Sequence, residues 1–212
     1  MNEADAPSDP HDRFPAGFFD RQDVDDTGFY VPPRFVTHID DGAIAAVGAL
    51  YTELGITGDV VDLMASWISH FEAAPRELHL LGMNQAELEA NPMAESAVVH
   101  DLNTDPRLPF ADESIDDAVC CVSIDYLVRP IDVIRDVARV VRPGGRLVCT
   151  FSNRCFPTKA IRGWLANSDE ARMNLVAEYF RLAGAWHEPI AQRRTPEGHR
   201  GDPLFAVWAE RV

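Results

Sequence analysis

Residues 116–152 read DDAVCCVSIDYLVRPIDVIRDVARVVRPGGRLVCTFS, the pattern of a strand, a helix, a tight turn and a second strand. The runs at 118–122 and 147–151 are apolar nearly throughout, as expected of strands buried on both faces of a parallel sheet. Between them, apolar residues recur at helical spacing at Ile131, Ile134, Val137, Val140 and Val141. Pro143 ends the helix, and the two glycines after it permit the reversal into the next strand. This unit predicts a parallel α/β sheet.

The chain before this unit also alternates between strand and helix. Short apolar runs predict strands at 59–63, 77–82 and 96–100. Helices are predicted over 41–54, from Trp67 onward and around 85–90. Such alternation implies right-handed crossovers, so we predict an α/β, doubly wound, mostly parallel Rossmann-like sheet with helices on both faces.

The region after Ser152 has a different character. Residues 159–165 and 171–183 predict helices, whereas 185–191 and 204–209 predict strands. A polar loop separates these two strands, so we expect them to pair in antiparallel fashion. The sheet is therefore predicted to carry an antiparallel edge strand near the C-terminus.

The N-terminal residues 1–27 are rich in Asp, Pro and Ala and show little periodicity. This composition predicts a flexible or loosely docked acidic arm. Phe14, Phe18 and Phe19 are the exception, because they would pin the arm to the domain or to a second subunit. Residues 28–212 have the length of a single α/β domain.

The composition limits the partners. A formal net charge of -15 argues against nucleic acid or an anionic membrane as the main partner, because both require cationic surfaces. No stretch approaches the ~20 apolar residues of a membrane span, and the N-terminus lacks the basic and apolar regions of a signal peptide, so we predict a cytoplasmic protein. The four cysteines show no Cys-x-x-Cys spacing, which predicts reduced core residues and no metal site.

The ligand site of an open α/β sheet lies outside the carboxyl ends of its strands. The segments that follow the predicted strands are 62–67, 82–85, 101–103, 123–126 and 152–155. These segments therefore hold the candidate functional residues.

The motifs at these strand ends, taken in order, resemble a known family. They are Val60-Val61-Asp62-Leu63, Leu81-Gly82-Met83-Asn84, Asp101-Leu102-Asn103 with Leu108-Pro109-Phe110, Ile115-Asp116 and the Pro143-Gly144-Gly145 turn. Together they resemble the class I S-adenosylmethionine-dependent methyltransferases, most of all the branch that acts on small molecules. The resemblance covers about residues 59–152, and it implies S-adenosylmethionine as the cofactor.

The resemblance also implies roles for individual positions. The implied cofactor-binding set is Asp62, Met64, Ala65, Ser66, Met83, Asn84, Asp101, Leu102 and Ser123. The loop 62–66 would face the methionine part, and Asn84 stands where the family usually has an acid for the ribose hydroxyls. Asp101 would accept from the adenine amino group, the Leu102 backbone would donate to a ring nitrogen, and Ser123 would lie under the sulfonium. A simple turn acid is the alternative interpretation of Asp101.

Two positions depart from the family pattern. The first loop, Asp62-Leu63-Met64-Ala65-Ser66-Trp67, has no glycine where the family has an Asp-x-Gly-x-Gly type of pattern, and Asn84 replaces an acid. A neutral amide accepts weaker hydrogen bonds than a charged carboxylate does. The missing glycines also argue against a dinucleotide, because a pyrophosphate needs close approach to a glycine-rich backbone.

In-line methyl transfer needs mainly positioning, and a general base only where the acceptor loses a proton. The catalytic candidates are Asp125 and Tyr126 after the fourth strand, and His38 before the first helix. The predicted substrate-binding residues are Tyr30, Asn153 and Arg154. The locally basic stretch 154–200 would suit an anionic acceptor, or would be a solvated face that balances nearby acids.

The predicted function is therefore S-adenosylmethionine-dependent methyl transfer to a small-molecule acceptor, by a monomer or homodimer. Two alternatives follow from the atypical first loop and Asn84. The chain would be a catalytically inactive binding or regulatory protein of the same fold, or it would use S-adenosylmethionine in another reaction.

Overall fold

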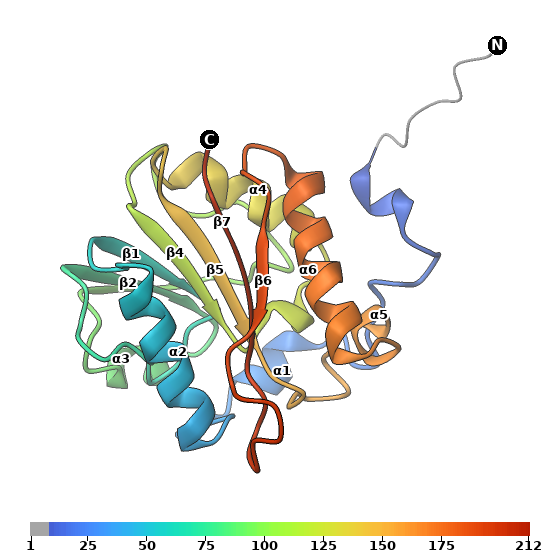
Figure 1. The fold of residues 1–212 in the computed structure, drawn as a ribbon, viewed down its shortest axis with the longest axis horizontal. Helices are drawn as coiled ribbons and strands as arrows, with labels where there is room; N and C mark the ends of the chain where they lie inside the picture. The colour runs from blue at the N-terminus through green and yellow to red at the C-terminus, as the bar shows by residue number, and fades with distance from the viewer. Residues whose placement is uncertain (1–8) are drawn as a thin grey trace.

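The computed structural model describes residues 9–212, which fold around one seven-stranded sheet of order β3-β2-β1-β4-β5-β7-β6 (Figure 1). The strands are β1 (Asp59–Leu63), β2 (Glu77–Gly82), β3 (Ser96–Val99), β4 (Asp117–Cys121), β5 (Arg146–Phe151), β6 (Ile190–Arg193) and β7 (Phe205–Glu210). The first five strands in this order run parallel, while β7 pairs antiparallel with β5 and β6. The predicted mostly parallel α/β sheet is confirmed.

Helices cover both faces of the sheet. The α-helices are α1 (Asp26–Tyr30), α2 (Asp41–Glu53), α3 (Gln85–Ala90), α4 (Pro130–Val140), α5 (Arg162–Leu165) and α6 (Asp169–Ala183), and the 3-10 helices are η1 (Pro10–Arg13) and η2 (Ile124–Tyr126). Apolar residues of α2 form a core with one face of the sheet, and those of α4 and α6 form a second core with the other face. Within residues 9–212 we find no helix that combines the length and the apolar character of a membrane span.

The β4–α4–β5 unit has the structure that its sequence predicts. Pro130 occupies the first turn of α4, where its missing N–H costs nothing. Both glycines of the following turn are needed. Gly144 has a φ of 82°, and a Cβ at Gly145 would overlap the carbonyl oxygen of Asp116. The turn therefore brings β5 directly beside β4.

The helix predicted from Trp67 onward does not form. Residues 64–76 are irregular, and side chains bond across this segment in place of a helical ladder. Trp67 donates from its indole nitrogen to the carbonyl oxygen of Val36 at 3.1 Å, and the Ser69 hydroxyl donates to Asp62 at 2.6 Å. These tertiary bonds outweigh a local helical preference that was weak.

The C-terminal strands differ from the predicted boundaries. The strand expected at 185–191 forms only at 190–193, because Gly184 and Ala185 both adopt positive φ and turn the chain after α6. The last strand, β7, does not lie at the edge but is inserted between β5 and β6. The antiparallel edge strand is therefore β6.

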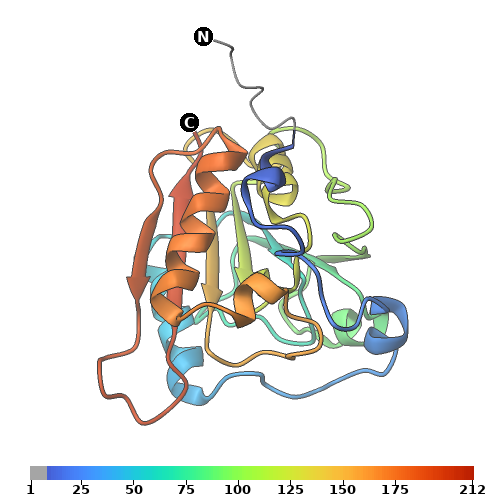
Figure 2. The same ribbon diagram turned by 90° about the vertical axis from the view of Figure 1, so that its right-hand side faces the viewer.

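Most of the predicted N-terminal arm packs against the domain (Figure 2). Its residues 1–8 lie outside the described residues. Phe14, Phe18 and Phe19 cluster with one another, and Phe14 approaches the ring of Tyr179 on α6 with a centroid distance of 5.9 Å. Gly163 of α5 admits the Phe18 ring, because a Cβ there would overlap it. Residues 9–27 thus lie along the face that α5 and α6 cover.

A buried ion cluster secures the end of this arm. Lys159, the only lysine of the chain, is buried, and its ammonium lies 3.0 Å from Asp23 and 3.2 Å from Asp26. Arg21 makes two parallel bonds to the Asp26 carboxylate, at 2.9 and 2.8 Å. These contacts place α1 and the segment after it against the carboxyl edge of the sheet.

Candidate functional site

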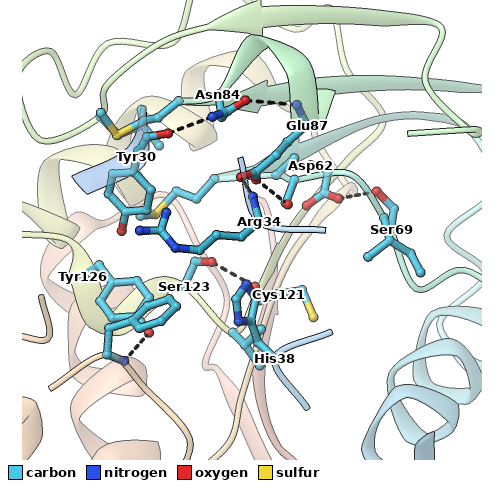
Figure 3. A pocket seen from close by; sticks show the side chains of 18 of the residues that line it. Tyr30, Arg34, His38, Asp62, Ser69, Asn84, Glu87, Cys121, Ser123 and Tyr126 are labelled. Atoms are coloured by element: carbon cyan, nitrogen blue, oxygen red, sulfur yellow. Dashed lines mark hydrogen bonds between the residues drawn. The ribbon is translucent and has the colours of Figure 1, made fainter. Parts of the chain in front are cut away.

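A pocket opens at the carboxyl ends of β1, β2 and β4, where an open α/β sheet binds its ligands (Figure 3). All nine residues of the predicted cofactor-binding set line it, although they come from four separate strand ends. The segment 30–38, which leads from α1 to α2, lines the pocket as well. The geometry thus brings together residues that are far apart in the sequence.

The first loop lies close to β2 although it has no glycine. Met64 stands at the first glycine of the family pattern and keeps a left-handed conformation, with a φ of 55°. The Ala65 amide donates to the carbonyl oxygen of Leu81 at 2.8 Å. A Cβ at Gly82 would overlap the Ala65 carbonyl oxygen. Gly82 therefore permits the close approach of loop and strand.

A second left-handed residue lies across the pocket. Val122, directly after β4, has a φ of 47°, although a β-branched residue rarely adopts this conformation. It lines the same pocket as Met64. Backbone strain of this kind, typically of order 1–3 kcal/mol per residue, concentrates at functional sites. Both strained residues flank the position where the cofactor's sulfonium end is expected.

Asp62 is a buried carboxyl at the end of β1 that faces the pocket. One of its oxygens accepts from Ser69 at 2.6 Å, and the Asn91 amide donates to the same hydroxyl at 3.0 Å. Burial raises the pKa of Asp62 to about 7, and the Ser69 bond opposes the shift only in part. A carboxyl in this state is suited to a cationic ligand group, which would favour its ionised form.

Two further polar atoms of the pocket lining lack partners among the described residues. The Tyr51 hydroxyl and the His70 Nδ1 are buried, and neither has a hydrogen-bond partner among the described residues. Both side chains line the pocket. Buried polar atoms are nearly always bonded, so such atoms in a pocket mark places for ligand atoms. Together with Asp62 they give the pocket three buried polar groups with bonding capacity left for a ligand.

Asn84 has structural bonds that its sequence position does not reveal. Its Oδ1 accepts from the amide of Glu87 and caps α3, while its Nδ2 donates to the carbonyl oxygens of Tyr30 at 2.8 Å and Val31 at 3.0 Å. Asn84 therefore connects the segment 30–38 to α3. A ribose contact would use only its remaining acceptor capacity, and the predicted role stays a prediction.

Glu87, one turn after Asn84, brings a carboxylate into the pocket lining. Its carboxylate accepts from the Ser66 hydroxyl at 2.6 Å and from the Arg34 amide at 2.7 Å. Glu87 thus connects the first loop to the segment 30–38. The Asn-x-x-Glu spacing, typical of a helix N-terminus, is the signal that could have pointed to this residue.

Asp101 lines the pocket and also closes a turn after β3. Its carboxylate accepts from the Asn103 amide at 2.9 Å and from the Thr104 hydroxyl at 2.7 Å. The turn role is therefore present, and an adenine contact would use a remaining lone pair of the same oxygens.

The end of the pocket beyond Ser123 is aromatic. Tyr30, Tyr126 and Phe156 line it, with the Tyr126 and Phe156 rings 6.1 Å apart. Burial raises the pKa of both tyrosines, so they remain protonated, and the Tyr126 hydroxyl accepts from the Phe156 amide at 2.9 Å. His38 lies 5.3 Å from Phe156, and desolvation lowers its pKa, which keeps the imidazole neutral. A neutral imidazole here could accept a proton.

Three predicted residues lie away from the pocket lining. Asp125 is buried, and burial raises its pKa to about 8. Asn153 is exposed, and Arg154 lies 3.8 Å from Asp202 at the surface. Their predicted roles stay predictions. Pocket residues that the sequence did not point to include Arg34, Tyr51, Glu87 and Phe156.

Comparisons with known sequences find methyltransferases. Residues 54–149 match the family model of a methyltransferase domain. Demethylmenaquinone methyltransferase of Mycobacterium sp. (strain KMS) is 48% identical over 56 residues, which cover 24% of this chain and 24% of that protein. The ubiquinone/menaquinone biosynthesis C-methyltransferase UbiE of Rubrivivax gelatinosus is 28% identical over 143 residues, covering 60% of this chain and 54% of the relative. The matches thus span between a quarter and about half of these relatives.

Comparisons with solved structures show the same fold. The [4+2]-cyclase SpnF aligns with a TM-score of 0.58 and 12% identity, covering 85% of this chain and 89% of the other. A possible histamine N-methyltransferase from Thermotoga maritima aligns with a TM-score of 0.57 and 16% identity, covering 81% and 91%. The chain has the fold of the class I S-adenosylmethionine-dependent methyltransferases, and residues 54–149 match the model of a methyltransferase domain.

Proposed function

We propose that this protein transfers the methyl group of S-adenosylmethionine to a small-molecule acceptor. One observation carries the proposal. The nine cofactor-binding residues that the family resemblance implies all line one pocket at the strand ends. Methyltransferase names among the relatives support the reaction class, and they leave the acceptor open.

The cofactor would supply an electrophilic methyl group, and the residues of this chain would orient it. Asp62 would face the ammonium group, with Tyr51 and His70 offering partners to the remaining amino-acid atoms. Ser123 donates to the Cys121 carbonyl oxygen at 3.0 Å, which holds the strand end under the expected sulfonium. Positioning of this kind accounts for most of the catalysis that a methyl transfer needs.

The acceptor would occupy the aromatic end of the pocket. Tyr30 and Tyr126 stay protonated there and exclude water around the reacting atoms. His38 would take a proton from an acceptor hydroxyl or amine, because its pKa is lowered and its ring lies beside Phe156 at this end.

The departures at the first loop favour a second candidate, a binding protein without methyl transfer. Met64 brings a side chain to the place of a glycine, and Asn84 has its polar atoms engaged within the protein. The likeness to a cyclase structure also keeps a different reaction on this fold open.

Calorimetric titration separates these possibilities. We expect S-adenosylmethionine and S-adenosylhomocysteine to bind with Kd values in the micromolar range, which corresponds to a binding free energy of about -8 kcal/mol. Adenosine, which lacks the amino-acid end, should bind at least tenfold more weakly, and NAD should not bind. An absence of binding at millimolar S-adenosylhomocysteine would contradict the proposal. Binding without formation of S-adenosylhomocysteine from S-adenosylmethionine would favour the binding protein.

A further inference from the structure

Arg34 brings a positive charge into the pocket of a strongly acidic protein. It is the only lysine or arginine among the pocket-lining residues, in a chain of net charge -15. Among residues 9–212, no carboxylate lies within ion-pair distance of its guanidinium. Two arginines of the basic stretch differ in this respect, since Arg154 lies 3.8 Å from Asp202 and Arg194 lies 2.5 Å from Glu53.

The guanidinium is held in place before any ligand arrives. The Arg34 backbone is fixed by its bond to Glu87, and Nη2 donates to the Phe29 carbonyl oxygen at 2.7 Å. The guanidinium carbon lies 4.2 Å from the centre of the Phe29 ring and 5.8 Å from that of Phe156. Because a guanidinium has five N–H donors, several remain for a ligand.

The direction of the side chain separates it from the expected cofactor contacts. In Figure 3 the guanidinium extends toward Tyr30 and Tyr126, and away from Asp62. The aromatic end of the pocket therefore combines flat apolar walls with one fixed cation. This combination suits a ring-bearing ligand with an anionic oxygen at its rim, because a guanidinium binds carboxylates in bidentate fashion and stacks on rings.

We propose that the methyl acceptor is an aromatic or conjugated acid whose anionic oxygen is bound by Arg34. This inference rests on the proposed methyl transfer, and it moves the anion-binding role from Arg154 to a residue inside the pocket. Arg34 is then a specificity-determining residue. Its substitution removes the preference for the acid over a neutral analogue of the same shape.

Two probes of matched shape test this preference, 4-hydroxybenzoate and its neutral amide, 4-hydroxybenzamide. Each is titrated into the wild type, Arg34→Gln, Arg34→Lys and Arg193→Gln, with and without saturating S-adenosylhomocysteine. Arg193 is the matched control, an exposed arginine outside the pocket. The wild type and Arg193→Gln should bind the acid about tenfold or more tightly than the amide. Arg34→Gln should reduce this ratio to about one, whereas Arg34→Lys should keep part of it.

The same titrations overturn the inference in two ways. A ratio near one in the wild type, or an unchanged ratio in Arg34→Gln, contradicts it directly. A tenfold weaker Kd for S-adenosylhomocysteine in Arg34→Gln assigns the guanidinium to the cofactor's carboxylate instead. If S-adenosylhomocysteine does not bind to the wild type, the proposed function fails, while the ratio measured without it still decides the role of Arg34.

Discussion

Met64 adopts the conformation of a glycine without being one. At the scale of single residues, this is the largest departure of the first loop from the family pattern, because the backbone keeps the left-handed φ while a long side chain enters the pocket lining. An unbranched side chain tolerates this conformation better than a β-branched one. The loop geometry is thus retained at a cost in stability.

Met64→Ile should lower the free energy of unfolding by about 1–2 kcal/mol more than the same substitution at a relaxed backbone, because branching at Cβ worsens the left-handed strain. Met83→Ile is the matched control, since Met83 lines the same pocket without a positive φ. Urea denaturation of both variants measures the difference. Equal losses would mean that packing, not backbone strain, determines the effect.

The raised pKa of Asp62 predicts a pH-dependent cofactor affinity. Below about 7 the carboxyl is protonated and loses its attraction for an ammonium group, so affinity for S-adenosylhomocysteine should rise about tenfold from pH 6 to pH 8. Asp62→Asn should abolish the part of the pH dependence that comes from the protein. Calorimetry at both pH values compares the two proteins, and the titration of the ligand itself is common to both. A parallel pH dependence in Asp62→Asn would refute the assignment.

The raised pKa of Asp62 also affects the stability of the folded protein, and this effect has the opposite pH dependence. A carboxyl whose pKa is raised on folding binds its proton more tightly in the folded state, so its contribution to stability is present below pH 3.8 and is lost as the pH rises through about 7. The pH range that should favour cofactor binding is therefore the range in which the free pocket is less stable.

The pocket residues could be predicted from the sequence where they follow a strand directly. Asp62, Asp101 and Ser123 meet at one edge because parallel strands end there, a consequence of topology alone. Arg34 could not be predicted in this way. It belongs to an irregular segment whose position depends on tertiary bonds such as the one to Glu87, 53 residues away.

At the scale of elements, the contact between the first loop and β2 depends on Gly82. Gly82→Ala should push the loop away, because the new Cβ would overlap the Ala65 carbonyl oxygen. We expect the affinity for S-adenosylhomocysteine to fall at least tenfold and the free energy of unfolding to fall by about 2 kcal/mol. Gly144→Ala is the control, because its Cβ meets no atom and adds only the strain of its positive φ, about 1 kcal/mol. Calorimetry and urea denaturation distinguish them. Unchanged ligand affinity in Gly82→Ala would show that the loop contact is not required.

The same scale shows why some elements were predictable and others were not. β4, α4 and β5 follow from apolar periodicity, because each buries its own pattern against its neighbours. The segment after Trp67 has no such pattern, and distant partners such as Val36 determine its conformation. Local sequence signals carry no information about such partners.

At the scale of the whole molecule, the arm and the domain form one unit through Lys159 and Asp26. Asp26→Asn should leave two buried cations undercompensated, lower the free energy of unfolding by about 3 kcal/mol and expose Lys159 to amine-reactive reagents. Asp20→Asn is the control, since Asp20 pairs with Arg162 at the surface and should cost less than about 1 kcal/mol. Mass spectrometry of the labelled peptides measures how far Lys159, the chain's only lysine, has reacted. Equal labelling in both variants would argue against a role of the cluster in docking the arm.

The position of β7 also affects the order in which the sheet can assemble. Residues 205–210 are the last strand of this sheet in chain order, yet they occupy an interior position between β5 and β6. Until they emerge, β5 has one unpaired edge, and β6 has no neighbour to join. Long-range pairings of this kind form slowly and leave strand edges open to other chains. A translational pause that holds residues 205–210 inside the ribosome should therefore prolong the need for a chaperone, whereas a pause after these residues have emerged should not.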